Sequence, residues 1–351
     1  EKKNPYFSFM ILVTGGTGLV GSHLLLNLVQ SGHRVRATYR KKDTINRAKH
    51  VFSYYTDNVD SLFSHIEWVQ ADITEIPSLL NAFIDITHVY HCAAYISFDP
   101  KYYHTLRKTN IEGTANIVNL CLSHNIKKLC HVSSIAAIGA IDTKKINTEE
   151  SSWNKEEDHS VYAITKYGSE LEVWRGCQEG LNVVIVNPGI IIGPGYWRLG
   201  SGHFFKRIAR GMTHYTTGVT GFVAIEDVIQ IMVSLMQSTL VNERYIVVAE
   251  NLSFKDFFNK IANALKVDPP IKRTSAFLLE IAWRMDWLRC KLKGKHRKLV
   301  KQSVKTLQRV SKFDNSKIKT ALNYSFKPMD TSIASTSHYF LNDEDASSKA
   351  T

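Results

Sequence analysis

Two side chains with complementary proton chemistry lie one helical turn apart near the middle of the chain. Tyr162 and Lys166 begin and end the segment YAITK, and this spacing places both side chains on one face of a helix. A phenol has a reference pKa of about 10, and a nearby ammonium group favours the phenolate. Lowering that pKa by about three units would correspond to about 4 kcal/mol. The pair could therefore exchange a proton with a substrate oxygen.

A glycine motif near the start of the chain predicts a nucleotide site. Gly15, Gly18 and Gly21 lie in the segment TGGTGLVG, between an apolar run and an amphipathic stretch. Glycines in such a strand–turn–helix allow a sharp turn, close approach of the backbone to a pyrophosphate, and tight packing of the helix on the sheet. The amide groups at the start of the helix attract phosphate. An ordinary glycine turn is the alternative.

The residues after the second predicted strand bear on the choice of cofactor. Arg40, Lys41 and Lys42 follow this strand, and no carboxylate occurs before Asp43. NAD-binding folds usually place an acidic residue here to bind the ribose 2′-hydroxyl. A guanidinium group can instead pair with a 2′-phosphate. The sequence therefore favours NADP(H) over NAD(H), with a solvated basic loop as the alternative.

Short apolar runs alternate with amphipathic segments over the first half of the chain, as in βαβ units. The predicted strands are Met10–Val13, Arg34–Tyr39, Ile66–Gln70, His88–His91, Lys128–Val132 and Val183–Asn187. The predicted helices include Gly18–Ser31, Tyr102–Ser123 and Ser160–Glu179. Apolar strands joined by helices predict an α/β fold of the Rossmann type, with a doubly wound parallel sheet.

The pattern changes after Pro188, where glycines crowd the stretch 189–202. We expect a dinucleotide-binding domain over residues 10–187 and 220–250, and a smaller, mostly helical substrate domain over 188–219 and 251–340. The ends, 1–9 and 341–351, are expected to be flexible. Substrate specificity is expected in Ile190–His203, in Ser97–Tyr103 and in the helices after Ala276.

Several motifs together make the chain resemble the extended short-chain dehydrogenase/reductase family, in the NAD-dependent epimerase/dehydratase superfamily. They are TGGTGLVG at 14–21, DI at 72–73, HCAA at 91–94, TNIEGT at 109–114, VSS at 132–134, YAITK at 162–166 and NPG at 187–189. The segment VRATYR at 35–40 is closest in character to dihydroflavonol reductase and, less so, to 3β-hydroxysteroid dehydrogenase-like members.

The resemblance implies roles for individual residues. It assigns catalysis to Ser134, Tyr162, Lys166 and Asn110. It assigns the cofactor to Gly15, Thr17, Gly18, Leu19, Val20, Arg40, Asp72, Ile73, Cys92, Ala93, Ala94, Tyr162, Lys166, Pro188 and Ile190. Ser133 remains an alternative to Ser134 for the substrate carbonyl. Asn110 either supports a water relay to the lysine or bonds the backbone, and Cys92 is expected to be an inert packing residue.

The resemblance also implies an activity. In the family pattern, hydride moves between the nicotinamide and a carbonyl or hydroxyl carbon, and Tyr162 exchanges the proton. We expect an NADP-dependent reductase or dehydrogenase of a small organic substrate. A nucleotide-sugar epimerase is the runner-up, and a non-catalytic NADP-sensing protein is the second alternative. Dehydratase chemistry is disfavoured, because Ile135 follows Ser134 where dehydratases carry acid–base residues.

Composition limits the remaining classes of protein. Of the 351 residues, 44% are hydrophobic and 22% charged, as in soluble globular proteins, and no apolar run is long enough to span a bilayer. Five scattered cysteines without a C-x-x-C pair favour a reducing cytoplasm over a disulfide framework or a zinc site. The histidines show no metal-binding spacing. We expect no metal.

The net charge of +12 comes from one segment, residues 255–319, which holds 18 Lys and Arg against 5 Asp and Glu. Within it, Leu288–Lys312 alternates apolar and basic residues. A solvated helix over the substrate site is the favoured interpretation; an anionic substrate and contact with a membrane surface are alternatives, and nucleic acid is not expected. By analogy with the family, Tyr102–Ser123 and Ser160–Glu179 are expected to form a homodimer interface.

Overall fold

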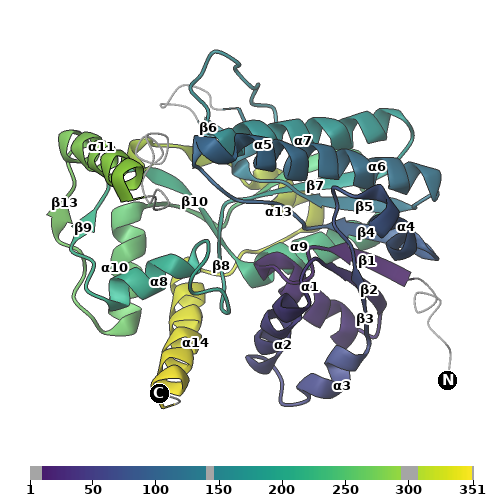
Figure 1. The fold of residues 1–351 in the computed structure, drawn as a ribbon, viewed down its shortest axis with the longest axis horizontal. Helices are drawn as coiled ribbons and strands as arrows, with labels where there is room; N and C mark the ends of the chain where they lie inside the picture. Colours follow the sequence, from purple (N-terminus) through teal and green to yellow (C-terminus); the bar gives the residue numbers. More distant parts are fainter. Residues whose placement is uncertain (1–9, 140–145, 294–306, 350–351) are drawn as a thin grey trace.

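A parallel sheet of seven strands forms the centre of the molecule (Figure 1). The computed structural model describes residues 10–139, 146–293 and 307–349. The strand order is β11-β7-β5-β4-β1-β2-β3, and every neighbouring pair is parallel. The strands are β1 (Met10–Thr14), β2 (Arg34–Tyr39), β3 (Ile66–Gln70), β4 (Ile86–His91), β5 (Lys128–Val132), β7 (Val183–Pro188) and β11 (Glu243–Val247).

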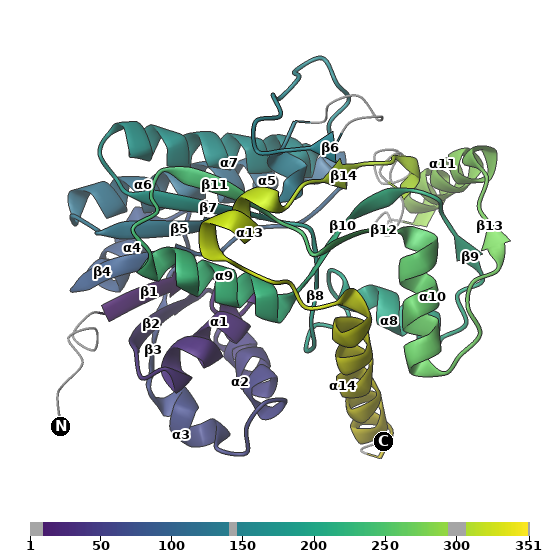
Figure 2. The ribbon, with the colours of Figure 1, turned by 180° about the vertical axis from the view of Figure 1, so that it is seen from behind.

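Helices cover both faces of this sheet (Figures 1 and 2). All six residues of β7 and four of five in β1 are buried, which explains why these strands are mainly apolar. One face packs against α1 (Leu19–Gln30) and α9 (Ile225–Gln237), and the other against α4 (Ile76–Phe83), α6 (Gly113–Ser123) and α7 (Val161–Gln178). The doubly wound fold predicted from the sequence is therefore confirmed.

The strand order reverses between β1 and β4. From β1 the chain proceeds through β2 to β3 on one side, whereas β4, β5, β7 and β11 extend the sheet on the other. In open α/β sheets, ligands bind at such a switch point, beyond the carboxyl ends of the strands. The fold thus places the glycine motif after β1 beside the residues that follow β4.

The helix predicted over Tyr102–Ser123 is not continuous. The segment consists of a 3₁₀ turn η3 (Pro100–Tyr102), α5 (Tyr103–Leu106), a π-helix η4 (Arg107–Glu112) and α6. The wider π turn departs from the 3.6-residue period on which the prediction depended. It contains Asn110, which is buried.

A smaller unit lies beside the main sheet. Its three-stranded sheet has the order β12-β10-β8, formed by β8 (Ile190–Ile192), β10 (Val219–Ala224) and β12 (Glu250–Ser253). The helices α8 (Gly202–Ala209), α10 (Phe254–Leu265) and α14 (Met329–Lys349) pack on it around a phenylalanine-rich core. Strand β10 belongs to this smaller sheet, although the sequence placed residues from 220 onward in the dinucleotide domain.

The remaining elements are short or peripheral. They comprise η2 (Lys42–Thr44), α2 (Ile45–Ser53), α3 (Val59–Ser64), η5 (Ile135–Ala137), β6 (Ile146–Asn147), β9 (His214–Tyr215), β13 (Lys272–Arg273), α11 (Ala276–Lys293), β14 (Lys312–Phe313) and α13 (Ser316–Leu322). Two-stranded pairs join β13 to β9 and β14 to β6.

The expectation of a flexible end from 341 onward is wrong for residues 341–349, which continue helix α14. Asp343 anchors this part of the helix, because its carboxylate accepts a hydrogen bond from Trp197 Nε1 at 2.6 Å and pairs with His50 at 3.1 Å. The expectation for residues 1–9, 350 and 351 lies outside the described residues.

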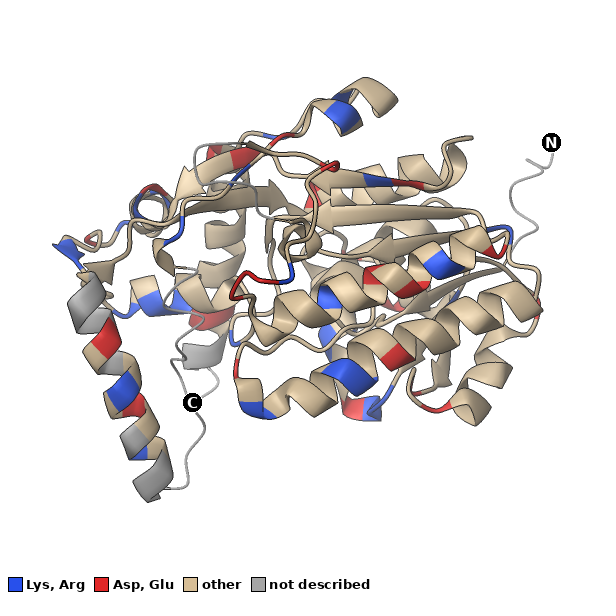
Figure 3. Ribbon diagram, turned by 90° about the horizontal axis from the view of Figure 1, so that it is seen from above, with Lys and Arg blue, Asp and Glu red and all other residues tan. Residues whose placement is uncertain are grey.

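Basic residues of the segment 255–319 are interspersed with acidic partners. On α11, the helix at the left of Figure 3, Arg284 pairs with Glu280 and Arg289 with Asp286. The prediction for Leu288–Lys312 lies largely outside the described residues, which omit 294–306. In the described part of the chain, no helix combines the length and apolarity that a bilayer crossing requires.

Candidate functional site: a glycine turn beside a serine, a tyrosine and a lysine

The glycine motif forms the tight turn between β1 and α1. Gly15 has a φ of 70°, and a Cβ atom there would lie 2.7 Å from the Cα atom of Ala93. A Cβ atom on Gly21 would lie 2.2 Å from the carbonyl oxygen of Gly15. Both positions therefore need glycine to build the turn. At Gly18 a Cβ atom would meet only that same oxygen, at 3.4 Å, so this position has open space beside it.

The start of α1 suits a phosphate group. Gly18 is the N-cap residue and provides no side-chain cap; the backbone amides and dipole of the first turn are the features that bind anions. Thr17, Leu19 and Val20 line this turn and are partly exposed. Tyr196, from the loop after β8, donates a hydrogen bond to the Thr17 carbonyl at 2.7 Å and braces the turn.

Most of the other predicted cofactor residues lie at or just after the carboxyl ends of strands of the sheet. Arg40 is exposed directly after β2, Asp72 and Ile73 follow β3, Cys92, Ala93 and Ala94 follow β4, Pro188 ends β7, and Ile190 begins β8. The fold thus brings these residues together. A turn that excludes side chains, small residues opposite it and an exposed cation fit a nicotinamide dinucleotide.

Asp72 and Ile73 are held by local contacts. The Oδ1 atom of Asp72 accepts hydrogen bonds from the backbone amide and the hydroxyl of Thr74, both at 2.9 Å. Ile73 is buried against α6, where a Cβ atom on Gly113 would lie 2.7 Å from its Cδ1 atom. The close packing of Gly113 on Ile73 fixes the position of the loop after β3.

Ser134, Tyr162 and Lys166 converge at the end of β5. Ser134 follows this strand and lies close enough to Tyr162, in the first turn of α7, to act on its titration. Lys166 is 2% exposed, and its Nζ atom donates to the Val132 carbonyl at 2.8 Å. The one-turn spacing of the tyrosine and lysine therefore brings both to the residues that end β5.

Burial sets the protonation of this group. Burial raises the pKa of Tyr162 to about 12, and the interaction with Ser134 opposes this rise. Burial lowers the pKa of Lys166 to about 8, while the negative charge of Glu170 acts in the opposite direction. We expected the protein to lower the pKa of Tyr162. The groups of the protein raise it instead. At neutral pH the phenol holds its proton and the lysine is mostly charged.

The two adjacent serines have different surroundings. Ser133 is 4% exposed and its hydroxyl donates to the carboxylate of Glu170 at 2.7 Å. Ser134 is partly exposed beside Tyr162, and its hydroxyl accepts a hydrogen bond from the Ala136 amide at 3.1 Å. Of the two hydroxyl groups, that of Ser134 is therefore the more accessible.

Asn110 makes the backbone contacts that were one of its two expected roles. Its Oδ1 atom accepts from the Tyr95 amide at 2.8 Å, and its Nδ2 atom donates to the Tyr95 carbonyl at 2.9 Å. Nδ2 also donates to the Thr165 hydroxyl at 3.1 Å. Asn110 thereby fixes the loop after β4 against α7, next to Lys166.

Cys92 lies at the expected position but in an unreactive environment. Burial raises the pKa of its thiol to about 12, which suppresses the nucleophilic thiolate. Among the described residues, no group of three or more His, Cys, Asp or Glu side chains is arranged to hold a metal ion.

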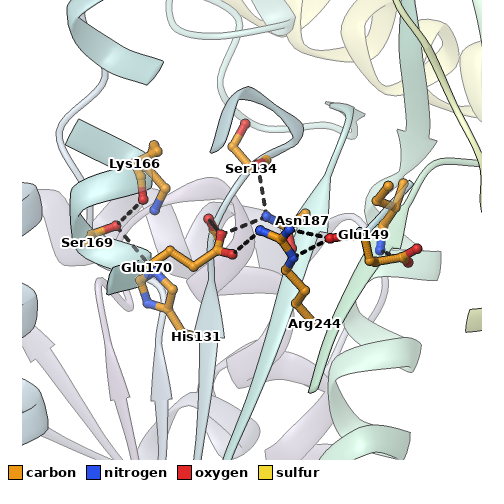
Figure 4. Close-up of polar contacts among 10 residues, drawn as sticks. His131, Ser134, Glu149, Lys166, Ser169, Glu170, Asn187 and Arg244 are labelled. Atoms are coloured by element: carbon orange, nitrogen blue, oxygen red, sulfur yellow. Dashed lines mark hydrogen bonds and ion pairs between the residues drawn. The ribbon is translucent and has the colours of Figure 1, made fainter. Parts of the chain in front are cut away.

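The sequence did not single out four residues around the site, although two of them, Phe98 and Tyr196, lie in the segments Ser97–Tyr103 and Ile190–His203 where it placed substrate specificity. Phe98 packs edge-on against Tyr162, with ring centroids 5.5 Å apart, and Tyr196 braces the glycine turn. Glu170 and Arg244 form an ion pair of 2.9 Å behind the serines (Figure 4). The sequence did contain a signal for Glu170: it follows Lys166 by four residues, the same spacing that places Lys166 on one helix face with Tyr162. The contacts of Phe98, Tyr196 and Arg244 depend on distant parts of the chain.

Comparisons with known proteins agree with this geometry. The model of the NAD dependent epimerase/dehydratase family matches residues 11–249. A Synechocystis protein named "Putative dihydroflavonol 4-reductase" is 27% identical over 339 residues, which cover 94% of each chain. Tetraketide alpha-pyrone reductase 2 of Arabidopsis thaliana is 29% identical over 251 residues, covering 67% of this chain and 76% of that protein.

A solved structure shares the fold at lower sequence similarity. The UDP-glucose 4-epimerase of Thermotoga maritima superposes with a TM-score of 0.75 and 20% identity, covering 95% of this chain and 99% of that chain. The match of the family model extends from β1 through β11, and so includes the dinucleotide turn and the Ser134, Tyr162 and Lys166 group. The chain belongs to the NAD dependent epimerase/dehydratase family, within the extended short-chain dehydrogenases/reductases.

Proposed function

We propose that the protein is an NADP-dependent oxidoreductase that transfers a hydride between the nicotinamide and a carbonyl or hydroxyl carbon of a small organic substrate. The observation that carries this proposal is the convergence of Ser134, Tyr162 and Lys166 at the end of β5, beside the glycine turn. The two reductase-named relatives support the reductase branch of the family.

The roles of the residues follow from their surroundings. When bound, the reduced dinucleotide supplies the hydride to the substrate carbon. In our proposal, the Ser134 hydroxyl orients the carbonyl oxygen, and Tyr162 donates its proton to that oxygen as the alcohol forms. Because burial keeps the phenol protonated, Tyr162 is suited to act as the acid in the reductive direction. The charge of Lys166 then stabilises the phenolate that remains.

Two further features support the finer parts of this proposal. The guanidinium of Arg40 is exposed at the end of β2, where it could pair with a 2′-phosphate. Phe98 contacts Tyr162 while 39% exposed, and nearby Ile96 is 60% exposed. Apolar side chains at the mouth of the site favour an apolar or aromatic substrate over a sugar nucleotide.

A substrate panel tests this function. The purified protein is mixed with NADPH and with a set of aromatic and alicyclic ketones and aldehydes, and oxidation is followed by absorbance. We expect NADPH oxidation with at least one carbonyl compound. In parallel samples that contain NAD⁺ in place of NADPH, we expect no interconversion of UDP-glucose and UDP-galactose. Epimerisation of the sugar nucleotide without NADPH oxidation by any carbonyl would overturn the proposal.

A further inference from the structure

A buried carboxylate lies one helical turn beyond the lysine. Tyr162, Lys166 and Glu170 are spaced four residues apart on α7, so they share a face of this helix. Glu170 is 1% exposed. A carboxylate at this depth is costly unless hydrogen bonds and an opposite charge compensate it. The proposed proton transfer does not use this group, so its burial needs another explanation.

The donors to Glu170 come from three neighbouring strands or the residues that follow them (Figure 4). Its Oε2 atom accepts from the Ser133 hydroxyl at 2.7 Å and from Asn187 Nδ2 at 2.9 Å. Its Oε1 atom accepts from Arg244 Nη1 at 2.9 Å. Arg244 is held in turn by the Glu149 carbonyl, which accepts from its Nε atom at 2.9 Å. One carboxylate therefore joins α7 to β5, β7 and β11.

The contacts of Glu170 are connected to the proposed catalytic residues in two ways, through Ser134 and through Lys166. Ser133 is the covalent neighbour of Ser134, and Asn187 Nδ2 also donates to the Ser134 carbonyl at 3.0 Å. Lys166 donates to the carbonyl of Val132, just before the serines. Glu170 thus fixes the three-residue segment 132–134, which both orients Ser134 and anchors the lysine.

The charge of Glu170 also acts on Lys166, whose pKa it raises against the effect of burial. His91, Cys92 and His131 interact with Lys166 as well. Burial lowers the pKa of His91 to about 3, lowers that of His131 well below its usual value, and raises that of Cys92 to about 12. These three groups are therefore uncharged near neutral pH. Tyr162 keeps its proton, and the Arg244 cation lies against the carboxylate of Glu170.

We propose that Glu170 is a positioning residue for proton transfer by Tyr162: it holds the segment 132–134 in place, and with it Ser134 and the backbone carbonyl that anchors Lys166. This inference rests on the proposed function, because it assigns the buried network to the same reacting group. A merely structural ion pair would stabilise the fold without affecting the titration of Lys166.

Titration of Lys166 by NMR tests the inference directly. The full chain is labelled with ¹³C-lysine, and a K166M spectrum assigns the Lys166 signal. In Glu170→Gln we expect the pKa of Lys166 to fall by about one pH unit, because a nearby opposite charge has been removed. Since Lys166 is charged only below its pKa, the high-pH limb of NADPH-dependent turnover should move down by the same amount.

The matched control is Glu172→Gln on the same helix. Glu172 pairs with Arg175 at 2.9 Å, with 29% and 37% of the two side chains exposed. This variant loses the same charge, but we expect the titration of Lys166 to be unchanged. Glu170→Asp keeps the charge with a shorter side chain, so it should retain the Lys166 titration and lower kcat.

An unchanged Lys166 pKa in folded Glu170→Gln would overturn the inference. If that single variant does not fold, the double variant E170Q/R244M removes both charges of the pair, a change that folds often tolerate. A fall in the pKa of Lys166 is still expected, but a smaller one, because the Arg244 cation is lost together with the carboxylate. The titration needs no substrate. A shifted Lys166 pKa without any carbonyl reduction would therefore contradict the proposed function and leave the charge effect of Glu170 supported.

Discussion

At the scale of single residues, the environment determines what each polar group can do. Ser133 and Ser134 are neighbours of the same type, yet one is bound to Glu170 and the other faces Tyr162. The sequence motif narrowed the choice to these two serines. It could not separate them, because the carboxylate that occupies Ser133 comes from 37 residues further along the chain.

The proposed preference for NADP(H) depends on a single residue, Arg40. We expect Arg40→Ala to raise the Kd for NADPH by about 10- to 100-fold and to leave that for NADH nearly unchanged, because a charged hydrogen bond to a phosphate contributes about 1.5–3 kcal/mol. Fluorescence titration of both dinucleotides measures this.

Arg34→Ala is the matched control for Arg40, because Arg34 begins β2 and is exposed at the opposite end of the strand from the proposed ribose site. This variant removes the same charge and should leave the Kd values for NADPH and NADH unchanged. Equal losses of NADPH and NADH affinity in Arg40→Ala, or no loss of either, would argue against a 2′-phosphate contact.

At the scale of elements, the apolar strands were the most predictable part of the chain. The bounds predicted for β2, β3 and β5 agree with the structure residue for residue. The π-helix η4 was not predictable from helical periodicity. Its wider turn accompanies the tertiary contacts of Asn110 with Tyr95 and Thr165.

The glycine turn allows a paired prediction about stability and binding. Gly18→Ala should fold with little change in the free energy of unfolding, because φ at Gly18 is −97° and the new Cβ atom would meet only one atom at 3.4 Å. It should nevertheless weaken NADPH binding at least about tenfold, since the backbone here must approach the pyrophosphate.

Gly21→Ala should behave differently. Its Cβ atom would lie 2.2 Å from the Gly15 carbonyl oxygen, and overpacking of this kind typically costs about 1–3 kcal/mol of stability. Chemical denaturation and NADPH titration of both variants measure the contrast. Full NADPH affinity in Gly18→Ala, or wild-type stability in Gly21→Ala, would contradict this account of the turn.

At the scale of the whole molecule, the sequence predicted the dinucleotide-binding half better than the smaller unit. The motifs of the first half lie in βαβ units whose connections follow general rules, so their meeting at one edge of the sheet could be anticipated. The smaller unit depends on pairing between β8, β10 and β12 and on a core from widely separated helices. Such long-range pairing leaves little local signal.

The buried hydrogen-bond network around Glu170 could not be predicted from the sequence either. Ser133, Glu170, Asn187 and Arg244 are spread over 112 positions, and their contacts exist only once the sheet has formed. The spacing of Tyr162, Lys166 and Glu170 was visible in the sequence. The residues that Glu170 contacts were not visible in the sequence.

The central claim is that Tyr162 supplies the proton during carbonyl reduction. The rate of NADPH oxidation by the Tyr162→Phe variant tests this claim most directly. With a carbonyl substrate found in the panel, the rate of NADPH oxidation is measured for the wild-type protein and for the variant, together with the Kd of each for NADPH. We predict that the variant binds NADPH within about threefold of wild type and loses at least about 100-fold in kcat, as expected when a general acid is removed. Wild-type turnover in Tyr162→Phe would contradict the assignment of the proton to this residue.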